Sequence, residues 1–368
     1  MNGETINIAQ LQESIAAQEA GWQASPNELT ALPPDELKLR LGFNPPPGQP
    51  SLAEREQAAK ASLAAHESGA LGAFGAPASF DLRNVGGRNF ITAVKNQGGC
   101  GSCVSFGTVA TVEGTLRWSI NDPNYPIDLS EAHLFYCHAR ALGRTCGNGW
   151  WPEPAFDAFK NIGVVDDACY PYTASDQNCT GRCADWANRV FKIGAWHSIT
   201  NPAQMKEWLS TRGPLETCFT VYTDFFAYRS GVYRQVSGKV EGGHCVSVVG
   251  YDDTAGCWIC KNSWGTGWGE AGFFRIAYGQ VGIDANMIAV DSFVTGVWQN
   301  NKRIVGLWSN NADRNAYVYV DGIGWKRITG DNDNIHLNML AQLIAAKAAN
   351  RPVNYFEESG VIKQVYVL

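Results

Sequence analysis

The sequence has no hydrophobic run that could cross a membrane, since none of its apolar stretches approaches the roughly 18 residues that a spanning helix needs. The N-terminal stretch MNGETINIAQLQESIAAQEAG lacks the apolar block of a signal peptide, so an export signal has been removed or export uses another route. An excess of positive charge is also absent, and the net charge of −6 argues against a general nucleic-acid-binding protein. What is present, 45% hydrophobic and 11% aromatic residues, predicts a globular protein.

Cysteine is missing from both ends of the chain. All 11 cysteines lie between positions 100 and 260. That number is high for a reduced cytosolic enzyme and indicates an oxidising compartment, either outside the cell or resembling a lysosome or vacuole. Because 11 is odd, at least one thiol has no partner within the chain, which suggests a chemical role for it. The chain is therefore divided into residues 1–77, 78–295 and 296–368.

The cysteine-free first part is predicted to be an accessory segment with short helices. Residues 32–42 predict one helix, with two prolines near its start and a glycine after its end. The next stretch, FNPPPGQP, cannot continue a helix. Residues 51–67 predict a second helix that begins with a capping box. Residues 68–79 are nearly uncharged and rich in glycine and alanine, which is typical of a flexible region open to cleavage.

The other two parts predict an α+β protein. Residues 103–120 have apolar side chains near helical spacing, and residues 129–137 predict a second helix. Residues 217–278 contain strand-like runs of β-branched and aromatic residues bounded by glycines. A helical half followed by a β half favours two lobes with a cleft between them. Residues 296–368 predict a small α+β module whose aromatic side chains form either a core or a binding face for a protein or glycan.

Two cysteines, Cys100 and Cys103, lie three positions apart in the stretch NQGGCGSCVSFG. A zinc site would need a second such pair about 15 to 20 residues away. The other pair with this spacing, Cys257 and Cys260, lies far along the chain in a strand-like run. A thioredoxin-like redox pair would need a preceding strand in a βαβ unit, which the sequence does not predict. The remaining interpretation is one structural and one reactive cysteine, with neither a metal nor a cofactor.

A reactive thiol at the start of a helix fits Cys103. The unpaired backbone N–H groups at a helix N-terminus favour a thiolate, the more so beside an imidazolium. Among the six histidines His244 is favoured as the base, because two glycines lead into its strand and let a substrate approach closely. Asn262 supplies a group that can orient the imidazole, and Trp264 is near enough to keep water from their hydrogen bond.

The order and spacing of these residues strongly resemble the papain family of cysteine proteases over residues 78–292. The short N-terminal segment and the β half look closest to cathepsin B. The insertion that blocks the cleft of cathepsin B is missing, because only 22 residues separate Cys146 from Cys169. The resemblance implies a papain-like fold with a helical left lobe, a β-barrel-like right lobe, an open cleft and endopeptidase action. The matching motifs are FDLR, NQGGCGSCVSF, LSEAHLFYC, CYPYTASDQNC, GGHCVSVVGYD and CKNSWGTGWGEAGFFRI.

The resemblance implies a role for each candidate residue. Cys103 matches the nucleophile, and His244 matches the residue that pairs with it and later protonates the leaving amine. Asn262 matches the residue that orients the imidazole. Gln97 matches the side-chain donor of the oxyanion hole, with the Cys103 backbone N–H as the second donor. Val104 stands where the family usually has a tryptophan, which predicts altered packing rather than lost chemistry.

The resemblance also implies disulfides and a specificity pocket. Cys218 and Cys245 match two positions in the wall of that pocket, where a disulfide and two buried thiols are both compatible with the sequence. Asn286 matches the pocket floor, and its neutral amide argues against a preference for basic residues. The remaining predicted substrate contacts are Gly149, Gly243 and Trp264. The predicted disulfides are Cys100–Cys146, Cys137–Cys179 and, as an additional pair, Cys169–Cys183.

The sequence therefore predicts an autoinhibited cysteine endopeptidase that hydrolyses proteins or peptides through a thioester on Cys103. Residues 1–77 are expected to be its inhibitory propeptide, which packs on the β lobe and crosses the cleft in the non-productive direction. Two alternatives stay open. One is a catalytically silent homologue that acts as a binding module, although the intact candidate residues weigh against it. The other is a transpeptidase that uses the same acyl-enzyme.

Overall fold

The chain folds into two compact units, one ending at Phe293 and the other beginning at Val294. The predicted propeptide and peptidase segments thus lie in the same unit. Within the described part of the chain, no helix is both long and apolar enough to span a membrane. Residues 68–74, most of the predicted cleavage region, lie outside the described residues. The computed structural model describes residues 6–67, 75–294, 296–330, 332–358 and 361–368.

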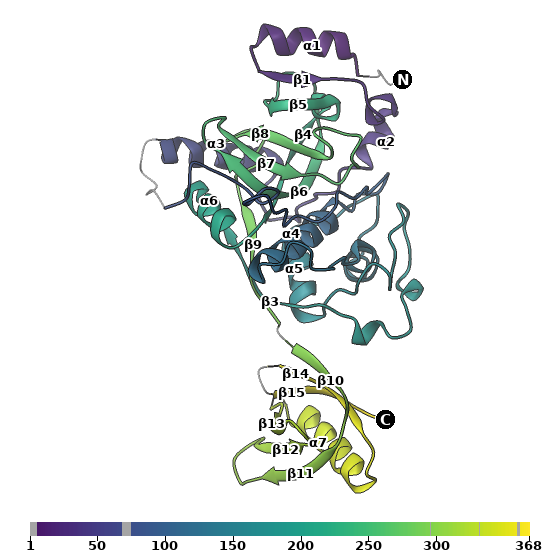
Figure 1. Cartoon of the computed structure of the whole chain (residues 1–368). Helices are drawn as coiled ribbons and strands as arrows, with labels where there is room; N and C mark the ends of the chain where they lie inside the picture. The colour runs from purple at the N-terminus through teal and green to yellow at the C-terminus, as the bar shows by residue number, and fades with distance from the viewer. Residues whose placement is uncertain (1–5, 68–74, 295, 331, 359–360) are drawn as a thin grey trace. The chain divides into compact units, whose positions relative to one another are not determined.

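A nine-stranded sheet forms the β lobe of the first unit (Figure 1). Its main path runs β1-β5-β8-β7-β6-β4-β9-β3, and β2 pairs with β6 beside this path. β4 and β6 are buried along almost their whole length, and polar residues such as Glu216 and His244 are buried in them together with the apolar ones. The strands are β1 (Trp22–Ala24), β2 (Ser79–Asp81), β3 (Ile193–Ile199), β4 (Leu215–Tyr222), β5 (Tyr228–Tyr233), β6 (Val240–Asp252), β7 (Cys257–Lys261), β8 (Phe273–Ala277) and β9 (Met287–Phe293).

The central helix of the other lobe is α4 (Cys103–Ser119), as the apolar spacing predicted. It packs against α5 (Pro152–Asn161) on one side and against β6 on the other. Nearly every side chain from Cys103 to Leu116 is buried, because the helix lies between the two lobes. A helix buried on all sides cannot have a strong polar face. Val104 is fully buried there, so an aliphatic side chain fills this part of the core.

The second predicted helix, residues 129–137, is mainly a π-helical segment over His133–Ala139. Ser130 stands at its start, and the Ser130 hydroxyl oxygen accepts a hydrogen bond of 2.8 Å from the His133 backbone N–H. A further helix, α6 (Pro202–Thr211), packs against β3 and β6. These elements complete the surroundings of the cleft.

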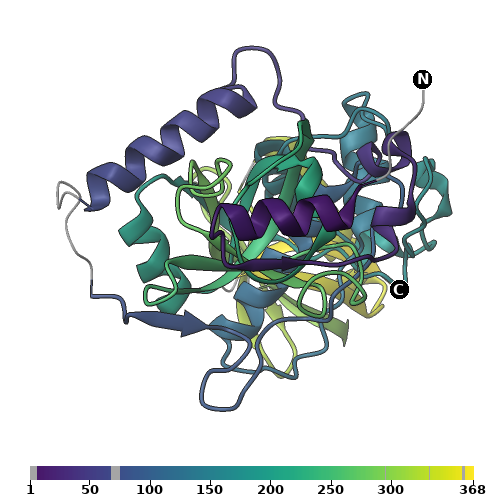
Figure 2. The ribbon, with the colours of Figure 1, turned by 90° about the horizontal axis from the view of Figure 1, so that it is seen from above.

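The N-terminal segment folds onto the first unit as three helices and one strand. Figure 2 shows α1 (Ile8–Ala17) and β1 lying over the β lobe, with α3 (Leu52–Glu67) at another side. α1 was not predicted, because only two of its side chains, Leu11 and Ile15, are buried and they form too short a pattern to detect.

The two predicted helices of this segment differ in how closely they match the structure. The helix expected at residues 32–42 is shorter, α2 (Pro34–Lys38). α3 has the predicted bounds and the predicted capping box. The Ser51 N–H donates to Glu54 Oε2 at 2.8 Å, and the Glu54 N–H donates to Ser51 Oγ at 3.3 Å.

The second unit is a six-stranded sheet packed against one helix, α7 (Asp333–Ala348). The strand order is β10-β14-β15-β13-β12-β11, with β13 and β15 parallel. Val318, Leu343 and Tyr355 lie in its core. β10 and β14 were not predicted, since they carry polar residues among their apolar ones. The strands are β10 (Gly296–Lys302), β11 (Ile304–Ser309), β12 (Ala316–Val320), β13 (Gly324–Ile328), β14 (Val353–Glu358) and β15 (Val361–Val367).

Candidate active site

Cys103 is the first residue of α4, and its thiol is free. Its side chain is fully buried. Burial raises the pKa of Cys103 to about 12, and the backbone amides of Cys245 and Gly42 offset only part of that rise. The helix N-terminus was expected to favour the thiolate. In this arrangement the loss of hydration is the larger effect, so the thiol is neutral.

His244 lies on β6 and is held by Asn262, which follows β7. The His244 Nε2–H donates to Asn262 Oδ1 at 2.8 Å, which leaves Nδ1 as the free acceptor of the imidazole. That Nδ1 atom is buried and has no hydrogen-bond partner. The centres of the Trp264 ring and the His244 imidazole are 4.6 Å apart. Trp264 therefore shields the His244–Asn262 hydrogen bond from water, as its position two residues after Asn262 predicted. Burial lowers the pKa of His244 to about 4, although the Asn262 hydrogen bond acts in the opposite direction.

Gln97 is fully buried, and its side-chain amide is fixed at both ends. The Ser263 hydroxyl donates to Gln97 Oε1 at 2.6 Å, which directs the Gln97 NH₂ group toward the start of α4. Gln97 Nε2 donates to the carbonyl oxygen of Cys100 at 2.8 Å and to that of Arg40 at 3.1 Å. An N-terminal residue therefore occupies one of the donor positions of this amide.

The N-terminal segment crosses the site as an extended strand near Phe43. The Phe43 N–H donates to the Gly243 carbonyl at 3.0 Å. On the other side, the Trp150 N–H donates to the Gly42 carbonyl at 2.7 Å, and the Asn44 N–H donates to the Trp150 carbonyl at 2.8 Å. Phe43 is antiparallel to Gly243 and parallel to Trp150. The segment thus joins the two lobes across the site.

Glycines permit this close crossing. A Cβ atom on Gly42 would lie 1.9 Å from the Gly101 carbonyl oxygen, and one on Gly149 would lie 2.0 Å from the Gly42 carbonyl oxygen. One on Gly243 would lie 2.6 Å from the Phe43 carbonyl oxygen. Gly149 also has a φ of +61°, which glycine adopts without strain. Gly149 and Gly243, both predicted as substrate contacts, therefore lie against the segment that crosses the site.

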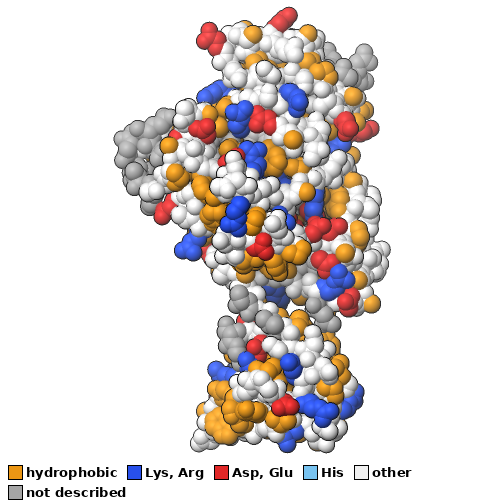
Figure 3. Space-filling model, viewed as in Figure 1, with side chains coloured by type: hydrophobic (Ala, Val, Ile, Leu, Met, Phe, Trp, Pro, Cys, Tyr) orange, Lys and Arg blue, Asp and Glu red, His pale blue; other side chains and the backbone are white. Residues whose placement is uncertain are grey.

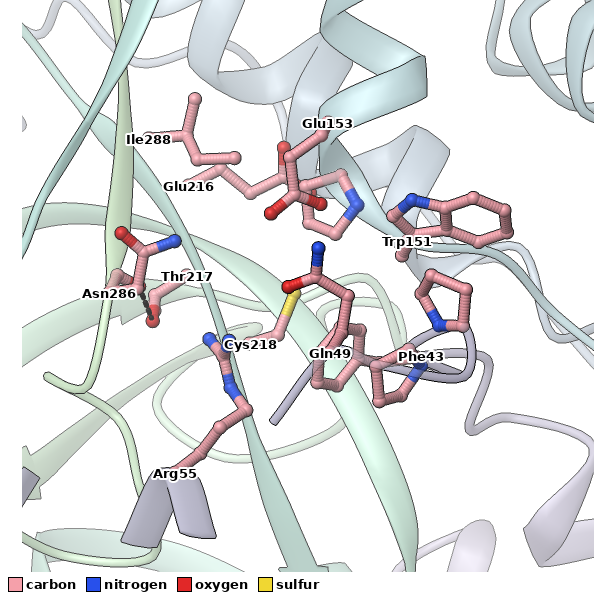
Figure 4. A pocket seen from close by; sticks show the side chains of 13 residues that line it. Phe43, Gln49, Arg55, Trp151, Glu153, Glu216, Thr217, Cys218, Asn286 and Ile288 are labelled. Carbon is pink, nitrogen blue, oxygen red and sulfur yellow. Dashed lines mark hydrogen bonds between the residues drawn. The ribbon is translucent and has the colours of Figure 1, made fainter. Parts of the chain in front are cut away.

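A pocket opens beside this crossing, between β4, the start of β9 and the N-terminus of α5 (Figure 4). Cys218 and Asn286, both predicted to belong to a specificity pocket, line it together with Glu216 and Glu153. The Asn286 Oδ1 atom is buried without a hydrogen-bond partner. Burial raises the pKa of Glu216 well above its ordinary value, even though the Thr108 hydroxyl donates to its Oε2 atom at 2.7 Å.

Residues of the N-terminal segment occupy the mouth of the pocket. Figure 4 shows Gln49 and Arg55 extending toward Cys218. The Arg55 guanidinium lies 5.0 Å from the centre of the Phe43 ring, a cation–π distance. Burial lowers the pKa of Arg55, and the nearby Glu153 opposes that shift. Trp264, predicted as a substrate contact, lies against the His244 imidazole.

Four disulfides are present in the described residues. They comprise the three predicted pairs and a fourth, Cys218–Cys245, which the sequence had left open. Two groups of His, Cys and Glu residues bring possible metal ligands together, but each contains a disulfide, which removes two thiolates from the group. The disulfides are Cys100–Cys146, Cys137–Cys179, Cys169–Cys183 and Cys218–Cys245, and the free cysteines are Cys103, Cys257 and Cys260.

Three residues of the site were missed in the sequence. Trp150 forms the backbone hydrogen bonds to the crossing segment, and backbone contacts between segments far apart in sequence leave no local pattern. Ser263 orients Gln97, and its position directly after Asn262 was the available signal. Glu216 is the single carboxyl in β4, and a buried carboxyl with a raised pKa marks a functional or tightly packed position.

Comparison with known proteins agrees with this architecture. The family model described as papain family cysteine protease matches residues 76–292. Cathepsin B-like CP3 of Giardia intestinalis is 40% identical over 228 residues, which cover 59% of this chain and 74% of that protein. Cathepsin B of Dictyostelium discoideum is 32% identical over 235 residues, covering 58% and 74%. The residues that the family model matches end before the second unit.

Solved structures show the same fold. Procathepsin B S9 from Trypanosoma congolense aligns with a TM-score of 0.63 at 23% identity, over 79% of this chain and 99% of that one. Digestive procathepsin L2 from Tenebrio molitor larval midgut aligns with a TM-score of 0.62 at 27% identity, over 77% and 88%. Both are proenzymes, and they confirm the predicted α+β two-lobe fold. This chain is a cysteine peptidase zymogen and belongs to the papain family of cysteine proteases.

Proposed function

We propose that this zymogen matures to an endopeptidase that hydrolyses peptide bonds through a thioester on Cys103. The observation that carries the proposal is the hydrogen bond between His244 and Asn262. It holds the proton on Nε2 and leaves Nδ1 free to take the proton of the Cys103 thiol. The missing insertion between Cys146 and Cys169 supports an open cleft, which accommodates a chain on both sides of the cleaved bond.

The reaction proceeds in two steps. His244 Nδ1 accepts the Cys103 proton, and the sulfur attacks the carbonyl carbon of the substrate. The Gln97 NH₂ group and the Cys103 N–H donate hydrogen bonds to the oxyanion. The imidazolium then protonates the leaving amine, and a thioester forms. Water, deprotonated by the same imidazole, hydrolyses the thioester and regenerates the thiol.

The N-terminal segment inhibits the enzyme in two ways. It uses the Gln97 donor for the Arg40 carbonyl, which denies that donor to a substrate. It also runs parallel to Trp150, and a substrate running the other way would pair antiparallel with the same residue. Its removal also rehydrates the site, which lets Cys103 and His244 form an ion pair.

Labelling with a thiol-directed epoxide tests this proposal. After removal of the N-terminal segment, we expect mass spectrometry to find one adduct, on Cys103, and activity to disappear with the same stoichiometry. Cys257 and Cys260 are internal controls, since both are free and buried. A folded mature protein without the Cys103 adduct would support the silent homologue. Products that incorporate an added amine instead of water would support the transpeptidase.

The second unit is proposed to be an accessory domain that binds a protein or glycan ligand. Aromatic side chains on the sheet face away from α7 support this role. Trp308 packs against Tyr317, and Tyr319 against Trp325, and three of these four rings are more than one-third exposed. Figure 3 shows apolar side chains gathered toward the β11 and β12 end of this unit. Removal of residues 296–368 should leave cleavage of small peptides unchanged and reduce cleavage of the recruited substrate.

The four disulfides support residence in an oxidising compartment, either outside the cell or resembling a lysosome or vacuole. Cell fractionation with a tagged chain tests this placement. Recovery of the oxidised protein from secretory vesicles or medium is expected, and a fully reduced cytosolic pool would contradict it.

A further inference from the structure

The Cys218–Cys245 disulfide joins two neighbouring strands at the pocket wall. Cys218 on β4 and Cys245 on β6 are directly opposite each other in the antiparallel register. Both side chains are almost completely buried. Cys245 follows His244 directly in sequence, so the bridge is covalently continuous with the strand that carries the imidazole. A change at this disulfide is therefore close both to the pocket and to the His244 imidazole.

The bridge also forms part of the pocket. Cys218 is one of its lining residues, and Figure 4 shows the Cys218 sulfur directed into the space between Gln49 and Glu216. The Glu216 carboxyl and the sulfur atoms of Cys218 and Cys245 lie within 4.8 Å of one another. This part of the wall thus combines sulfur, the buried Glu216 carboxyl and the side chain of Ile288.

We propose that the Cys218–Cys245 disulfide determines the specificity of this pocket by setting its width. The proposal rests on the proposed peptidase function and concerns substrates with an apolar side chain at the position that this pocket binds. Bonded sulfur atoms share one compact volume, whereas two thiols must stay at van der Waals separation. The state of the bridge therefore decides how much room is left for the substrate side chain.

Reduction should narrow the pocket. A dithiol supplies two electrons and two protons, the S–S bond breaks, and Cys218 and Cys245 each become a thiol while the dithiol is oxidised. β4 is hydrogen-bonded to β6 on one side and to β9 on the other, so the strands cannot separate. The sulfur atoms must move apart by rotation, and the Cys218 thiol turns into the pocket, where there is space.

Substitution by alanine should have the opposite effect. In C218A/C245A both sulfur atoms are removed, and the pocket becomes wider by their combined volume. Steric discrimination of this kind is modest for each added methylene, about 10-fold or more in kcat/KM. Reduction of the disulfide and its replacement by alanines thus shift the preference for large over small side chains in opposite directions. A general loss of stability would not have this effect.

The test uses the mature enzyme and matched pairs of fluorogenic peptides that carry phenylalanine or valine at one position near the cleaved bond. Each position is varied in turn, and the pair between which the wild type discriminates most is used. The readout is the ratio of kcat/KM for the phenylalanine peptide to that for the valine peptide. We expect this ratio to rise about 10-fold in C218A/C245A. In the wild type it should fall by a similar factor as graded dithiothreitol reduces the bridge, which peptide mapping follows. The C169A/C183A control, which lacks a different disulfide, should keep the wild-type ratio.

The proposal is overturned if C218A/C245A has the wild-type ratio, or if reduction of the bridge leaves the ratio unchanged. If C218A/C245A does not fold, the wild-type reduction series alone decides. Failure of the proposed peptidase function has a different signature: the wild type cleaves neither peptide and Cys103 forms no adduct.

Discussion

The imidazole of His244 is held by Asn262 through a hydrogen bond of 2.8 Å that is fully enclosed by protein. His244 on β6 and Asn262 just after β7 thereby fix which nitrogen carries the proton and which one is free. In the mechanism proposed above, the remaining nitrogen acts on the thiol only while this bond holds the ring.

Removing the Asn262 side chain should therefore impair catalysis more than binding. In mature N262A we expect kcat/KM to fall about 100-fold, because the imidazole loses its orientation. KM should change little, since Asn262 does not line the pocket. Steady-state kinetics measures both constants, and epoxide labelling of Cys103 verifies that the variant is folded. An unchanged kcat would contradict the positioning role.

Gln97 offers a separate test of oxyanion stabilisation. We expect Q97A to lower kcat about 100- to 1,000-fold, the usual cost of one oxyanion donor. S263A should have a smaller effect of the same kind, because it only releases the Gln97 amide from its fixed orientation. Comparing kcat of Q97A and S263A separates the contribution of the Gln97 amide from that of Ser263, which orients it. Equal losses would mean that Ser263 acts by another route.

The stability of the closed zymogen should depend on pH, because the His244 imidazole is buried beside Asn262. The pKa of His244 is lowered to about 4, so the folded zymogen holds a neutral imidazole, whereas the unfolded or opened form binds a proton near pH 6.5. The opened form therefore takes up more protons between pH 6.5 and 4, and the closed state loses stability as the pH falls through this window.

We expect the inactive C103A zymogen to expose its N-terminal segment more readily at pH 4.5 than at pH 7, as measured by limited proteolysis. C103A/H244F, which cannot titrate at this position, should show a smaller difference. An identical pH dependence in both variants would assign the effect to other groups.

The crossing at Gly42 should not tolerate a side chain. In G42A the new Cβ atom would meet the Gly101 carbonyl oxygen at 1.9 Å, so the N-terminal segment must lift away from Cys103. We expect the uncleaved variant to react with the epoxide much faster than the wild-type zymogen. G75A is the matched control, since a Cβ atom there meets nothing within 4 Å. Equal labelling rates for G42A and wild type would show that the crossing is looser than its geometry indicates.

Trp22 anchors the N-terminal segment far from the cleft. It packs against Tyr228 and Tyr233, and its Nε1–H donates to the Arg234 carbonyl at 2.9 Å. Loss of such a buried ring lowers the free energy of unfolding by about 3 to 5 kcal/mol. The substitution W22A should therefore destabilise the closed state, and the zymogen should process itself at neutral pH. The time course of self-processing measures this, with the exposed substitution E13A as control. Processing at the wild-type rate would contradict the anchoring role.

The main helices and strands and the candidate residues could be located from the sequence by their motifs. Glycines, helix caps and apolar spacing are local signals, so they can be read without the fold. α3, with its capping box, and α4, which begins at Cys103, are examples. α1 and β1 were not predicted, since their few buried residues become meaningful only against the β lobe. The contact of Trp150 with the N-terminal segment was also missed, because backbone pairing between remote segments leaves no local pattern.

The sequence alone determined which chemistry is possible: one free cysteine at a helix start, a histidine after paired glycines, and an asparagine before a tryptophan. Only the tertiary structure decided how these groups are buried and which cysteines are bonded. Burial under the N-terminal segment outweighs the helix N-terminus at Cys103, and the pairing of β4 with β6 brings Cys218 and Cys245 into one bond. Hydration and distance between remote residues exist only in the folded chain, so no local pattern could have revealed them.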